Sequence, residues 1–335
     1  MSTYSEAGVD VAAAERFTES IAERVTATWG ENVVGTFGGF AAGLTIPAGY
    51  DEPVLMMTTD GVGTKAEIAR ALGRFDGIGH DLVAMCVDDL AASGAAPLGF
   101  TDYLAVGALD AIRDQALVAS VADACRLAGC ALLGGETAVH PGVMEPTQFD
   151  LAGAALGVVE RNAMVDPGQV KAGHAVVGVV SPNLRSNGFS LVRSLFNESD
   201  YQRPALGSSL GEILLEPSVV YAPAVLAATR RVPVSGMVHV TGGGLPGNLP
   251  RALPAGLTAR IDPTRWEPAP IFNLISDQGR IDPAEMFATF NMGIGFALIA
   301  EAEAVADLIG ALDEHGHAAH HIGDIVTGET VLIGS

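Results

Sequence analysis

The chain carries little positive charge and few charged residues of either sign. Its 335 residues include 18 basic and 39 acidic side chains, a formal net charge of −21, which excludes a nucleic-acid-binding protein that relies on a basic surface. Charged residues make up 17% of the chain, against about 25% in typical soluble domains. Hydrophobic residues make up 49%, so the composition excludes intrinsic disorder and predicts that much surface is buried between subunits of an oligomer.

Long apolar runs, a leader segment and paired cysteines are also lacking. The longest apolar stretch, residues 151–159, is far shorter than the roughly 18 residues of a membrane span, and the first residues lack the basic and apolar regions of a signal peptide. We therefore expect a cytoplasmic protein with no membrane partner. The three cysteines, Cys86, Cys125 and Cys130, are odd in number and lack metal-ligand spacing, so we expect buried structural thiols.

Lysine is almost absent, and one of the two lysines follows a glycine-rich turn. Only Lys65 and Lys171 are present, and Lys65 ends the segment Asp60-Gly61-Val62-Gly63-Thr64-Lys65, which follows a strand expected at 54–58. Backbone N–H groups of such a turn, the N-terminus of the next helix and a mobile lysine together suit phosphate oxygens. The glycine spacing differs from that of a Walker A loop or a dinucleotide fingerprint, and an ordinary strand-to-helix turn is the alternative.

Apolar periodicity and turn residues divide the chain into alternating helices and strands. In the first half we expect helices at 11–29, 64–72, 79–93 and 110–128 and strands at 54–58, 98–106, 131–133 and 151–159. In the second half we expect strands at 175–180, 238–240, 257–261, 293–299 and 321–326, and helices at 188–196, 217–230, after 244, and at 301–314. A turn-rich segment at 165–173 predicts a boundary between two domains, 1–165 and 166–335, each a layered α/β or α+β sandwich.

Four carboxylates lie at the expected ends of these elements. Asp60 precedes the glycine turn, Asp88 and Asp89 lie near the end of a helix, and Glu136 follows a strand within Gly134-Gly135-Glu136-Thr137. Magnesium bound to nucleotide phosphates takes a few carboxylates from different segments, so this set predicts a Mg²⁺ site. Solvated surface charge is the alternative for any one of them, because acidic residues are numerous in this chain.

A third segment, His239-Val240-Thr241-Gly242-Gly243-Gly244, leaves a strand and enters a helix. Three successive glycines leave backbone amides accessible to an anionic ligand, and a tight turn is the alternative. Beside them His239 is a candidate for ligand contact or proton transfer, or else a histidine satisfied at the end of its strand. Ser186-Asn187-Gly188 opens another helix, where a helix cap without a ligand is the simpler interpretation.

Taken in order, these segments resemble one family, the phosphoribosylformylglycinamidine cyclo-ligases of purine biosynthesis, also called aminoimidazole ribonucleotide synthetases. No single segment decides the resemblance, but the ordered set is specific and covers almost the whole chain. The matching segments are Tyr4 with 7–10, 38–40, 59–65, 81–90, 94–97, 102–103, 134–138, 141–142, 186–193, 239–244 with Asn248, and 285–293.

The resemblance implies a homodimer whose N-terminal domains join mixed sheets across the two-fold axis, each followed by an α/β sandwich domain. ATP and formylglycinamidine ribonucleotide then bind in the groove between the domains. In such enzymes ATP phosphorylates the formyl amide oxygen, the amidine nitrogen attacks the activated carbon, the imidazole ring closes and phosphate leaves. Phosphoryl transfer of this kind asks the protein mainly for positioning and charge neutralisation.

The resemblance also implies roles for the segments described above. ATP is held by Asp60, Gly61, Val62, Gly63, Thr64 and Lys65 and by Gly134, Gly135, Glu136 and Thr137. Mg²⁺ is held by Asp60, Asp88, Asp89 and Glu136. The substrate is contacted by Gly38, Gly39, Ser186, Asn187, Thr241, Gly242, Gly243 and Gly244, and the candidate catalytic residues are Lys65, Asn187 and His239.

Several positions depart from the family pattern, among them Thr36-Phe37 in place of a usual Gly-Leu and Ala288 in place of a usual basic residue. Arg185 stands where the pattern Gly-x-His-Ser-Asn-Gly has histidine, Val139 where an acidic residue is common, and Asp88 where asparagine is common. Arginine neutralises phosphate but does not shuttle protons near neutral pH. A catalytically weakened paralogue that binds nucleotide as a regulatory dimer is therefore the alternative function. Related ATP-dependent enzymes, such as thiamine monophosphate kinase and selenophosphate synthetase, fit less well because no reactive cysteine lies near the N-terminus.

Overall fold

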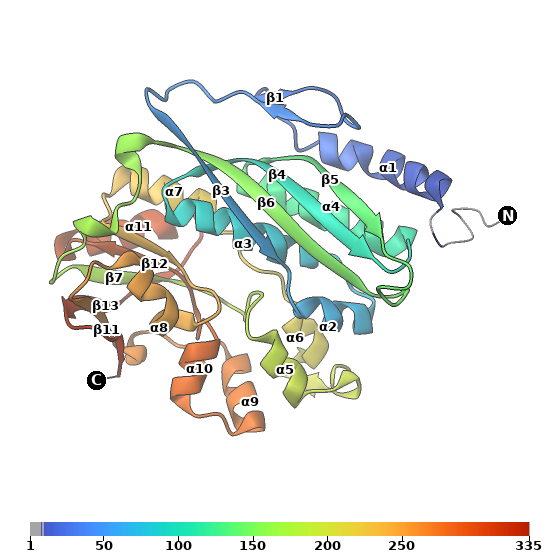
Figure 1. Cartoon of the computed structure of the whole chain (residues 1–335). Helices are drawn as coiled ribbons and strands as arrows, with labels where there is room; N and C mark the ends of the chain where they lie inside the picture. Colours follow the sequence, from blue (N-terminus) through green and yellow to red (C-terminus); the bar gives the residue numbers. More distant parts are fainter. Residues whose placement is uncertain (1–7, 9, 335) are drawn as a thin grey trace.

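Two β-sheets organise the chain, and the computed structural model describes residue 8 and residues 10–334 (Figure 1). The first half contains helices α1 Val11–Thr26, α2 Lys65–Leu72, α3 Ile78–Ala92 and α4 Ala111–Ala128, and strands β1 Val33–Val34, β2 Gly43–Leu44, β3 Pro53–Gly61, β4 Ala96–Val106, β5 Ala131–Val139 and β6 Phe149–Glu160. The second half contains helices α5 Phe189–Leu195, α6 Leu210–Leu214, α7 Ala222–Arg231, α8 Gly244–Asn248, α9 Pro270–Gly279, α10 Pro283–Thr289 and α11 Val305–Asp313. Its strands are β7 Ala175–Val180, β8 Pro204–Ala205, β9 Ser208–Ser209, β10 Gly236–His239, β11 Leu257–Ile261, β12 Ile294–Ala300, β13 Ala319–Thr327 and β14 Leu332–Ile333.

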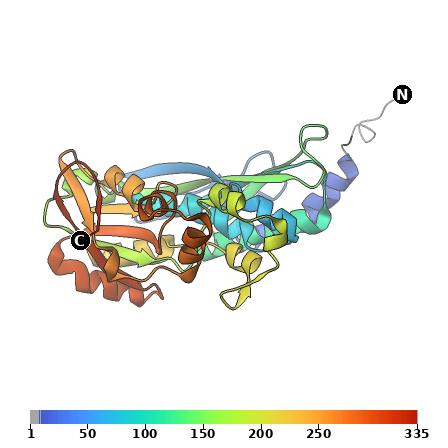
Figure 2. The ribbon, with the colours of Figure 1, turned by 90° about the horizontal axis from the view of Figure 1, so that it is seen from below.

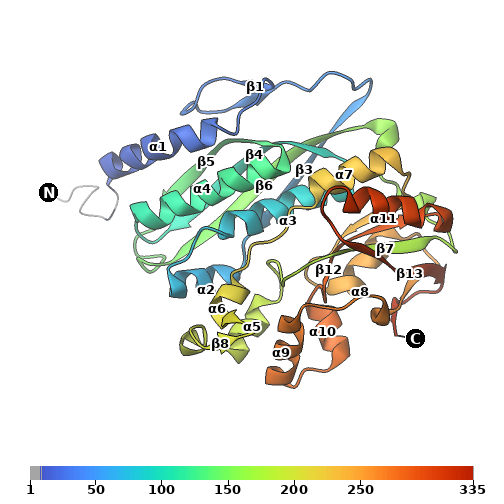
Figure 3. The ribbon, with the colours of Figure 1, turned by 180° about the vertical axis from the view of Figure 1, so that it is seen from behind.

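The N-terminal sheet is mixed and has helices on one face only. Its strand order is β3-β6-β4-β5, with β4 and β5 parallel and the other neighbours antiparallel. Helix α3 packs on β3 and β6, and α4 packs on β5 and α3, as Figure 3 shows from behind. Nearly every residue of α3 is buried, which is why most of its side chains are apolar. Asp110 caps the first turn of α4 by accepting from Ile112 N–H and Arg113 N–H.

The opposite face of this sheet exposes apolar side chains. Leu55 and Met57 alternate along β3 with half-buried inward residues, and 51% and 75% of their surfaces are exposed. Tyr103 of β4 lies on the same face and is 44% exposed. Solvent-facing strand positions are usually polar, so this face carries more apolar surface than a free sheet requires.

The C-terminal sheet is covered by helices on both faces. Its order is β10-β12-β7-β13-β11-β14, antiparallel except for β11 and β14. Helices α7 and α11 pack on one face, and α8 with the 3-10 turn at 249–252 packs on the other, each over its own apolar cluster. The layered α/β sandwich predicted from the sequence is confirmed, and Figure 2 shows the two sheets lying end to end in an elongated molecule.

The two halves share one hydrophobic core. The cluster under the N-terminal sheet includes Leu82 and Val83 of α3 together with Phe189 of α5, Phe272 of α9 and Phe290. Each of these five side chains is buried. Segments 184–226 and 271–290 of the second half therefore fix their position by packing on the first half, which places residues from both halves around the same site.

The sequence predicted most elements, with differences at their ends. The helix expected at 11–29 ends at Thr26, and β3 continues to Gly61. Strand β5 continues to Val139, so Glu136 lies within the strand rather than after it, because the parallel ladder with β4 runs through both glycines. Helices α6, α9 and α10 were not expected. The three cysteines are free and buried, as expected, and Tyr4, Ala7 and Val9 of the family-like pattern lie outside the described residues.

Candidate active site

One row of residues across the N-terminal sheet carries two of the expected ligand-binding segments. Asp60 pairs with Gly153, Gly153 pairs with Asp102, and Asp102 pairs with Gly135. Asp60 and Gly135 thus lie three strand spacings apart, roughly 14 Å, on the two edge strands. The glycine turn that follows β3 and the Gly-Gly-Glu-Thr segment of β5 therefore lie in the same part of the sheet but do not touch.

A cavity of about 630 Å³ lies beside β5, and we call it the β5 cavity. It brings together two of the predicted sets, Gly38 with Gly39 and residues 134–137. Phe17 and Ile21 of α1 supply apolar walls, and Asp102 supplies a carboxyl group. Its volume is within the range of small-molecule sites, about 300–1,000 Å³.

Asp102 is a candidate functional residue that the sequence analysis did not select. Only 9% of its surface is exposed, and burial raises the pKa of its carboxyl group to about 7. Its side chain occupies the space that Gly135 leaves, since a Cβ atom on residue 135 would lie 2.2 Å from Asp102 Oδ1. The available signal was an acidic residue on the inward side of an otherwise apolar strand, and such a perturbed carboxyl group lining a cavity is typical of functional sites.

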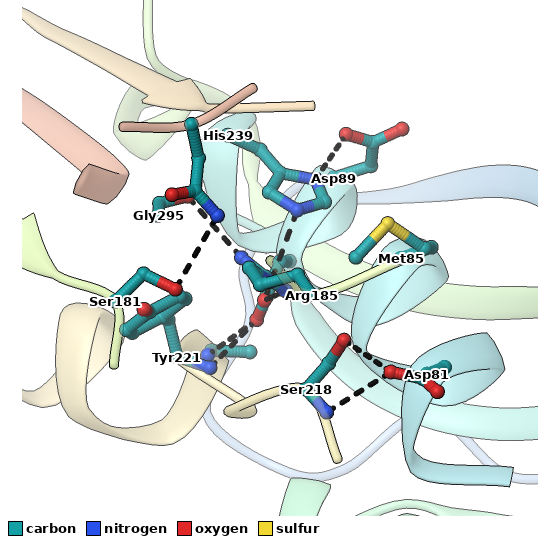
Figure 4. Close-up of polar contacts among 12 residues, drawn as sticks. Asp81, Met85, Asp89, Ser181, Arg185, Ser218, Tyr221, His239 and Gly295 are labelled. Atoms are coloured by element: carbon teal, nitrogen blue, oxygen red, sulfur yellow. Dashed lines mark hydrogen bonds and ion pairs between the residues drawn. The ribbon is translucent and has the colours of Figure 1, made fainter. Parts of the chain in front are cut away.

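A second cavity, of about 340 Å³, lies between the two halves, and we call it the interdomain cavity. Asp89 of α3, His239 of β10, Asn248 and Arg251 line it. His239 Nδ1 lies 2.9 Å from Asp89 Oδ1, and Figure 4 shows this pair. Because a carboxylate only accepts, Nδ1 carries the proton and His239 donates to Asp89. The predicted residues Asp89 and His239 are therefore in direct contact, with Asp89 37% exposed and the His239 side chain 1% exposed.

Asp60 belongs to the same acidic group as Asp89. Burial raises the pKa of Asp60 and the negative charge of Asp89 raises it further, although the hydrogen bond from Gly61 N–H acts in the opposite direction. A divalent cation near both oxygens would remove this repulsion, and oxygen donors are the ligands that Mg²⁺ prefers. Asp60 and Asp89 thus fit a magnesium site. Glu136 does not join them, because it is the strand partner of the outward-facing Tyr103 and so lies on the opposite face of the sheet. Within residues 8 and 10–334, no three His, Cys, Asp or Glu side chains form a complete metal-ligand group.

Lys65 is not a mobile side chain in this structure. Its Nζ atom is fully buried and donates to Asp81 Oδ1 at 2.9 Å, to the Arg185 carbonyl at 3.1 Å and to the Glu216 carbonyl at 2.8 Å. Burial lowers the pKa of Lys65, and Asp81 opposes that shift. All three N–H groups have protein acceptors, so no donor is left for a phosphate. This corrects the expectation of a mobile cation, because Lys65 begins α2 with its side chain turned toward α3.

Asp88 is also saturated by protein donors. Its Oδ1 atom accepts from Tyr221 N–H at 2.8 Å and Ala222 N–H at 2.9 Å, and its Oδ2 atom accepts from Arg185 Nη2 at 2.6 Å. The residue is fully buried. This corrects the expectation that Asp88 is a metal ligand, since its carboxylate binds the first turn of α7 and an arginine instead.

Gly38 and Gly39, two of the predicted substrate residues, line the β5 cavity, whereas the others lie along the junction between the two halves. Ser186 Oγ donates to the Val62 carbonyl at 2.8 Å, and Asn187 Nδ2 lies 3.5 Å from Met85 Sδ. Asn187 also lies beside the triple glycine, because a Cβ atom on Gly242 would be 3.5 Å from its Oδ1. Ser186 and Asn187 therefore meet the glycine turn, α3 and the 241–244 segment at one place.

The triple glycine itself forms a locked turn. Asn248 Nδ2 donates to the Gly242 carbonyl at 3.1 Å and the Gly244 carbonyl at 2.9 Å. Gly243 and Gly244 have φ angles of +92° and +55°, and a Cβ atom on Gly244 would lie 1.9 Å from the Phe287 carbonyl oxygen. Gly243 and Gly244 are thus required by backbone geometry, whether or not Thr241 and its neighbours contact a ligand.

Comparison with known proteins identifies the family. The family described as AIR synthase related protein, N-terminal domain, matches residues 41–159, and its C-terminal domain counterpart matches residues 171–334. The phosphoribosylformylglycinamidine cyclo-ligase of Thermosynechococcus vestitus is 46% identical over 99% of this chain and 98% of its own. The cyclo-ligase of Carboxydothermus hydrogenoformans is 46% identical with the same coverage.

This chain belongs to the phosphoribosylformylglycinamidine cyclo-ligase family. The resemblance drawn from the sequence is confirmed, and with it the function as an ATP-dependent cyclo-ligase of purine biosynthesis. Solved structures with the same fold include thiamine-monophosphate kinase from Stenotrophomonas maltophilia K279a, with TM-score 0.71, 20% identity and coverage of 94% of this chain and 95% of that one. The hydrogenase maturation protein HypE in complex with ATP has TM-score 0.68, 20% identity and coverage of 94% and 87%. No helix in the described part of the chain is long and apolar enough to cross a membrane.

Proposed function

We propose that this cyclo-ligase closes the imidazole ring of 5-aminoimidazole ribonucleotide from formylglycinamidine ribonucleotide, with conversion of ATP to ADP and phosphate. The observation that carries the proposal is the 46% identity, over nearly the full length of both chains, to relatives named for this reaction. Proteins of the same fold with other names share only about a fifth of their residues with this chain, so they support the fold alone.

We place the nucleoside of ATP in the β5 cavity. Its apolar walls suit a purine ring, and Asp102 offers a buried acceptor for a base amino group or a ribose hydroxyl. The backbone of Gly38 and Gly39, which lack side chains, leaves room for phosphate oxygens at the same cavity. Gly134, Gly135, Glu136 and Thr137 keep their predicted role as ATP contacts, whereas Lys65 loses that role.

We place the Mg²⁺ site at Asp60 and Asp89, where it would neutralise phosphate charge. Asp89 lines the interdomain cavity, its charge raises the pKa of Asp60, and neither carboxylate is saturated by protein donors in the way that Asp88 is. His239 donates from Nδ1 to Asp89 and so fixes the orientation of that carboxylate. Its proposed contribution is thus to position Asp89 rather than to exchange protons with the substrate.

The interdomain cavity suits the ribonucleotide substrate. Arg251 brings a cation to a chain that has very few of them, and its Nη1 atom donates to Asn248 Oδ1 at 3.2 Å. Because a ribonucleotide phosphate is an anion, Arg251 is a suitable partner for it. Ser186 and Asn187 at the adjoining junction, together with residues 241–244, keep their predicted substrate role.

We propose that the chain is a homodimer that buries the outer face of the N-terminal sheet. Leu55, Met57 and Tyr103 form the apolar part of that face, and the low charge of the chain favours an oligomer. Glu136 lies on the same face and would therefore approach the interface. The division into domains 1–165 and 166–335 and the cytoplasmic location stay predictions.

The test is ATP hydrolysis by the purified protein with Mg²⁺, with formylglycinamidine ribonucleotide present or absent. We expect ADP release that depends on the substrate and matches the aminoimidazole product measured colorimetrically. Thiamine monophosphate is the control substrate, because an enzyme of the same fold acts as its kinase. ATP binding without turnover would instead support the regulatory paralogue, and turnover of the control alone would overturn the proposal.

A further inference from the structure

Arg185 is a buried arginine at the junction between the two halves, and the proposed reaction gives it no role. Its side chain is 1% exposed, and its backbone has a φ angle of +59°, which is unusual for a residue with a side chain. Nη2 donates to Asp88 Oδ2 at 2.6 Å and Nη1 donates to the Gly295 carbonyl at 3.2 Å. The guanidinium carbon lies 4.7 Å from the centre of the Tyr221 ring, and Figure 4 labels both residues. A side chain so enclosed does not reach a phosphate.

The contacts of Arg185 run in both directions between the halves. Its guanidinium, from the second half, holds Asp88 of α3. Its carbonyl oxygen accepts from Lys65, which belongs to the first half and pairs with Asp81. We call Lys65, Asp81, Asp88 and Arg185 the interdomain ion cluster. It has two positive and two negative side chains, all buried, so each charge is compensated within the cluster.

Arg185 also determines which carboxylate His239 meets. Asp88 Oδ2 lies 4.0 Å from His239 Nε2, beyond hydrogen-bond distance, and the same oxygen accepts from Arg185. His239 is left to donate to Asp89, the carboxylate that faces the interdomain cavity. Without Arg185, Asp88 Oδ2 would be a buried charged atom without a hydrogen-bond donor. His239 Nε2, 4.0 Å away, could supply that donor.

The strained backbone of Arg185 directs the residues that follow it. Ser186 Oγ donates to the Val62 carbonyl, and Thr64 and Ser190 hydroxyls lie 3.2 Å apart. These contacts hold the start of α5 against the glycine turn. The left-handed conformation at residue 185 is therefore part of how Ser186 reaches the site, and the bonds of the guanidinium maintain it.

We propose that Arg185 is a positioning residue for the cyclo-ligase reaction, and that it acts as a unit with Asp88, with which it forms a buried charged pair. Both residues depart from the family pattern described from the sequence, and the structure places the two departures in direct contact. Arg185 acts through Asp88 on the His239–Asp89 pair and through the backbone on Ser186. The proposal rests on the cyclo-ligase activity proposed above.

The test is a double-mutant cycle of Arg185→His, Asp88→Asn and the double variant in the full-length protein. We expect each single variant to lower kcat by about tenfold or more, because misplacing catalytic groups is costly, and to lower Tm, because a buried charge is left unpaired. The double variant should regain most of the lost Tm and a kcat within about threefold of wild type. Arg231→His is the matched control, since Arg231 is 55% exposed in a surface ion pair with Glu314.

Arg185→Lys separates positioning from mere stability. Lysine keeps the charge next to Asp88 but cannot also hold the Gly295 carbonyl in the planar geometry of a guanidinium. We expect kcat to fall while the KM for ATP stays near wild type, because the β5 cavity lies at the other edge of the sheet.

Four results would overturn the proposal. Losses in the double variant that simply add would show that the two residues are independent, and recovery of Tm without recovery of kcat would leave a purely structural pair. Unchanged kinetics in Arg185→His would show that Arg185 has no positioning role. Wild-type protein without turnover would overturn the proposed function and the positioning role with it, whereas coupling in Tm would survive as a property of the pair.

Discussion

Replacement of Lys65 by alanine is expected to lower the free energy of unfolding by about 4 kcal/mol. The reason is that Asp81 would lose its ion-pair partner Lys65 while its carboxylate stays buried away from water. Removal of one partner from a buried ion pair typically costs about 3–5 kcal/mol. Ser218 would still donate to Asp81 from its N–H at 3.0 Å and its hydroxyl at 2.5 Å, which keeps the cost within that range. The carbonyl groups of Arg185 and Glu216 would also lose a donor.

The assay is urea unfolding followed by circular dichroism, combined with the KM for ATP of the folded variant. Lys171→Ala is the matched control, because Lys171 is the other lysine of the chain and is exposed, and we expect it to change stability by less than about 0.5 kcal/mol. A double variant, Lys65→Met with Asp81→Asn, should recover part of the stability that is lost when Lys65 alone is replaced, since no buried charge is then unpaired. Wild-type stability of Lys65→Ala together with a KM for ATP raised by orders of magnitude would refute the reasoning and restore Lys65 as a phosphate ligand.

Three further predictions concern the β5 cavity and the sheet. The pKa of Asp102 is raised to about 7, so the folded state keeps its proton while the unfolded state releases it near pH 4, and Asp102 lowers stability by up to about 4 kcal/mol as pH rises from 4 to 7. Asp102→Asn should therefore flatten this part of the stability profile in urea unfolding and raise the KM for ATP. An unchanged profile would contradict the assigned burial. Gly135→Ala should raise the KM for ATP by about tenfold or more, because its Cβ atom would displace the Asp102 carboxyl group, and steady-state kinetics with a normal KM would remove Asp102 from the nucleotide site. Met57→Glu should convert the proposed dimer to a monomer in light scattering after size exclusion, and a variant dimer of unchanged mass would place the interface elsewhere.

The sequence predicted the architecture well because its signals are local. The apolar strand before Asp60, the mostly apolar helix at 79–93 and the Asp110 cap each specify an element without knowledge of its neighbours. The glycine turn, the carboxylates and the triple glycine were found in the same way, from residue type and position. Asp89 and His239 were both selected as candidates, and the structure places them in contact.

The partners of buried charged residues could not be predicted from the sequence. Lys65 and Asp88 stand in segments that suit phosphate and metal, but their partners Arg185 and Glu216 are between 97 and 151 residues away in sequence. The direction of a side chain at the start of a helix depends on the surface that it faces. A lysine after a glycine-rich turn can therefore be a phosphate ligand or a buried ion-pair partner, and only the tertiary structure distinguishes the two. Asp102 was missed for the related reason that burial, not residue type, raises its pKa.

The most direct test of the central claim is the fate of the formyl amide oxygen of the substrate. Formylglycinamidine ribonucleotide carrying a heavy oxygen isotope at that position is turned over with ATP, and the released phosphate is analysed by mass spectrometry. Phosphorylation of the amide oxygen followed by ring closure predicts that the heavy oxygen appears in phosphate in equal amount with the aminoimidazole product. Phosphate without the label would contradict the account, because the ATP would then have been hydrolysed by water rather than used to activate the substrate.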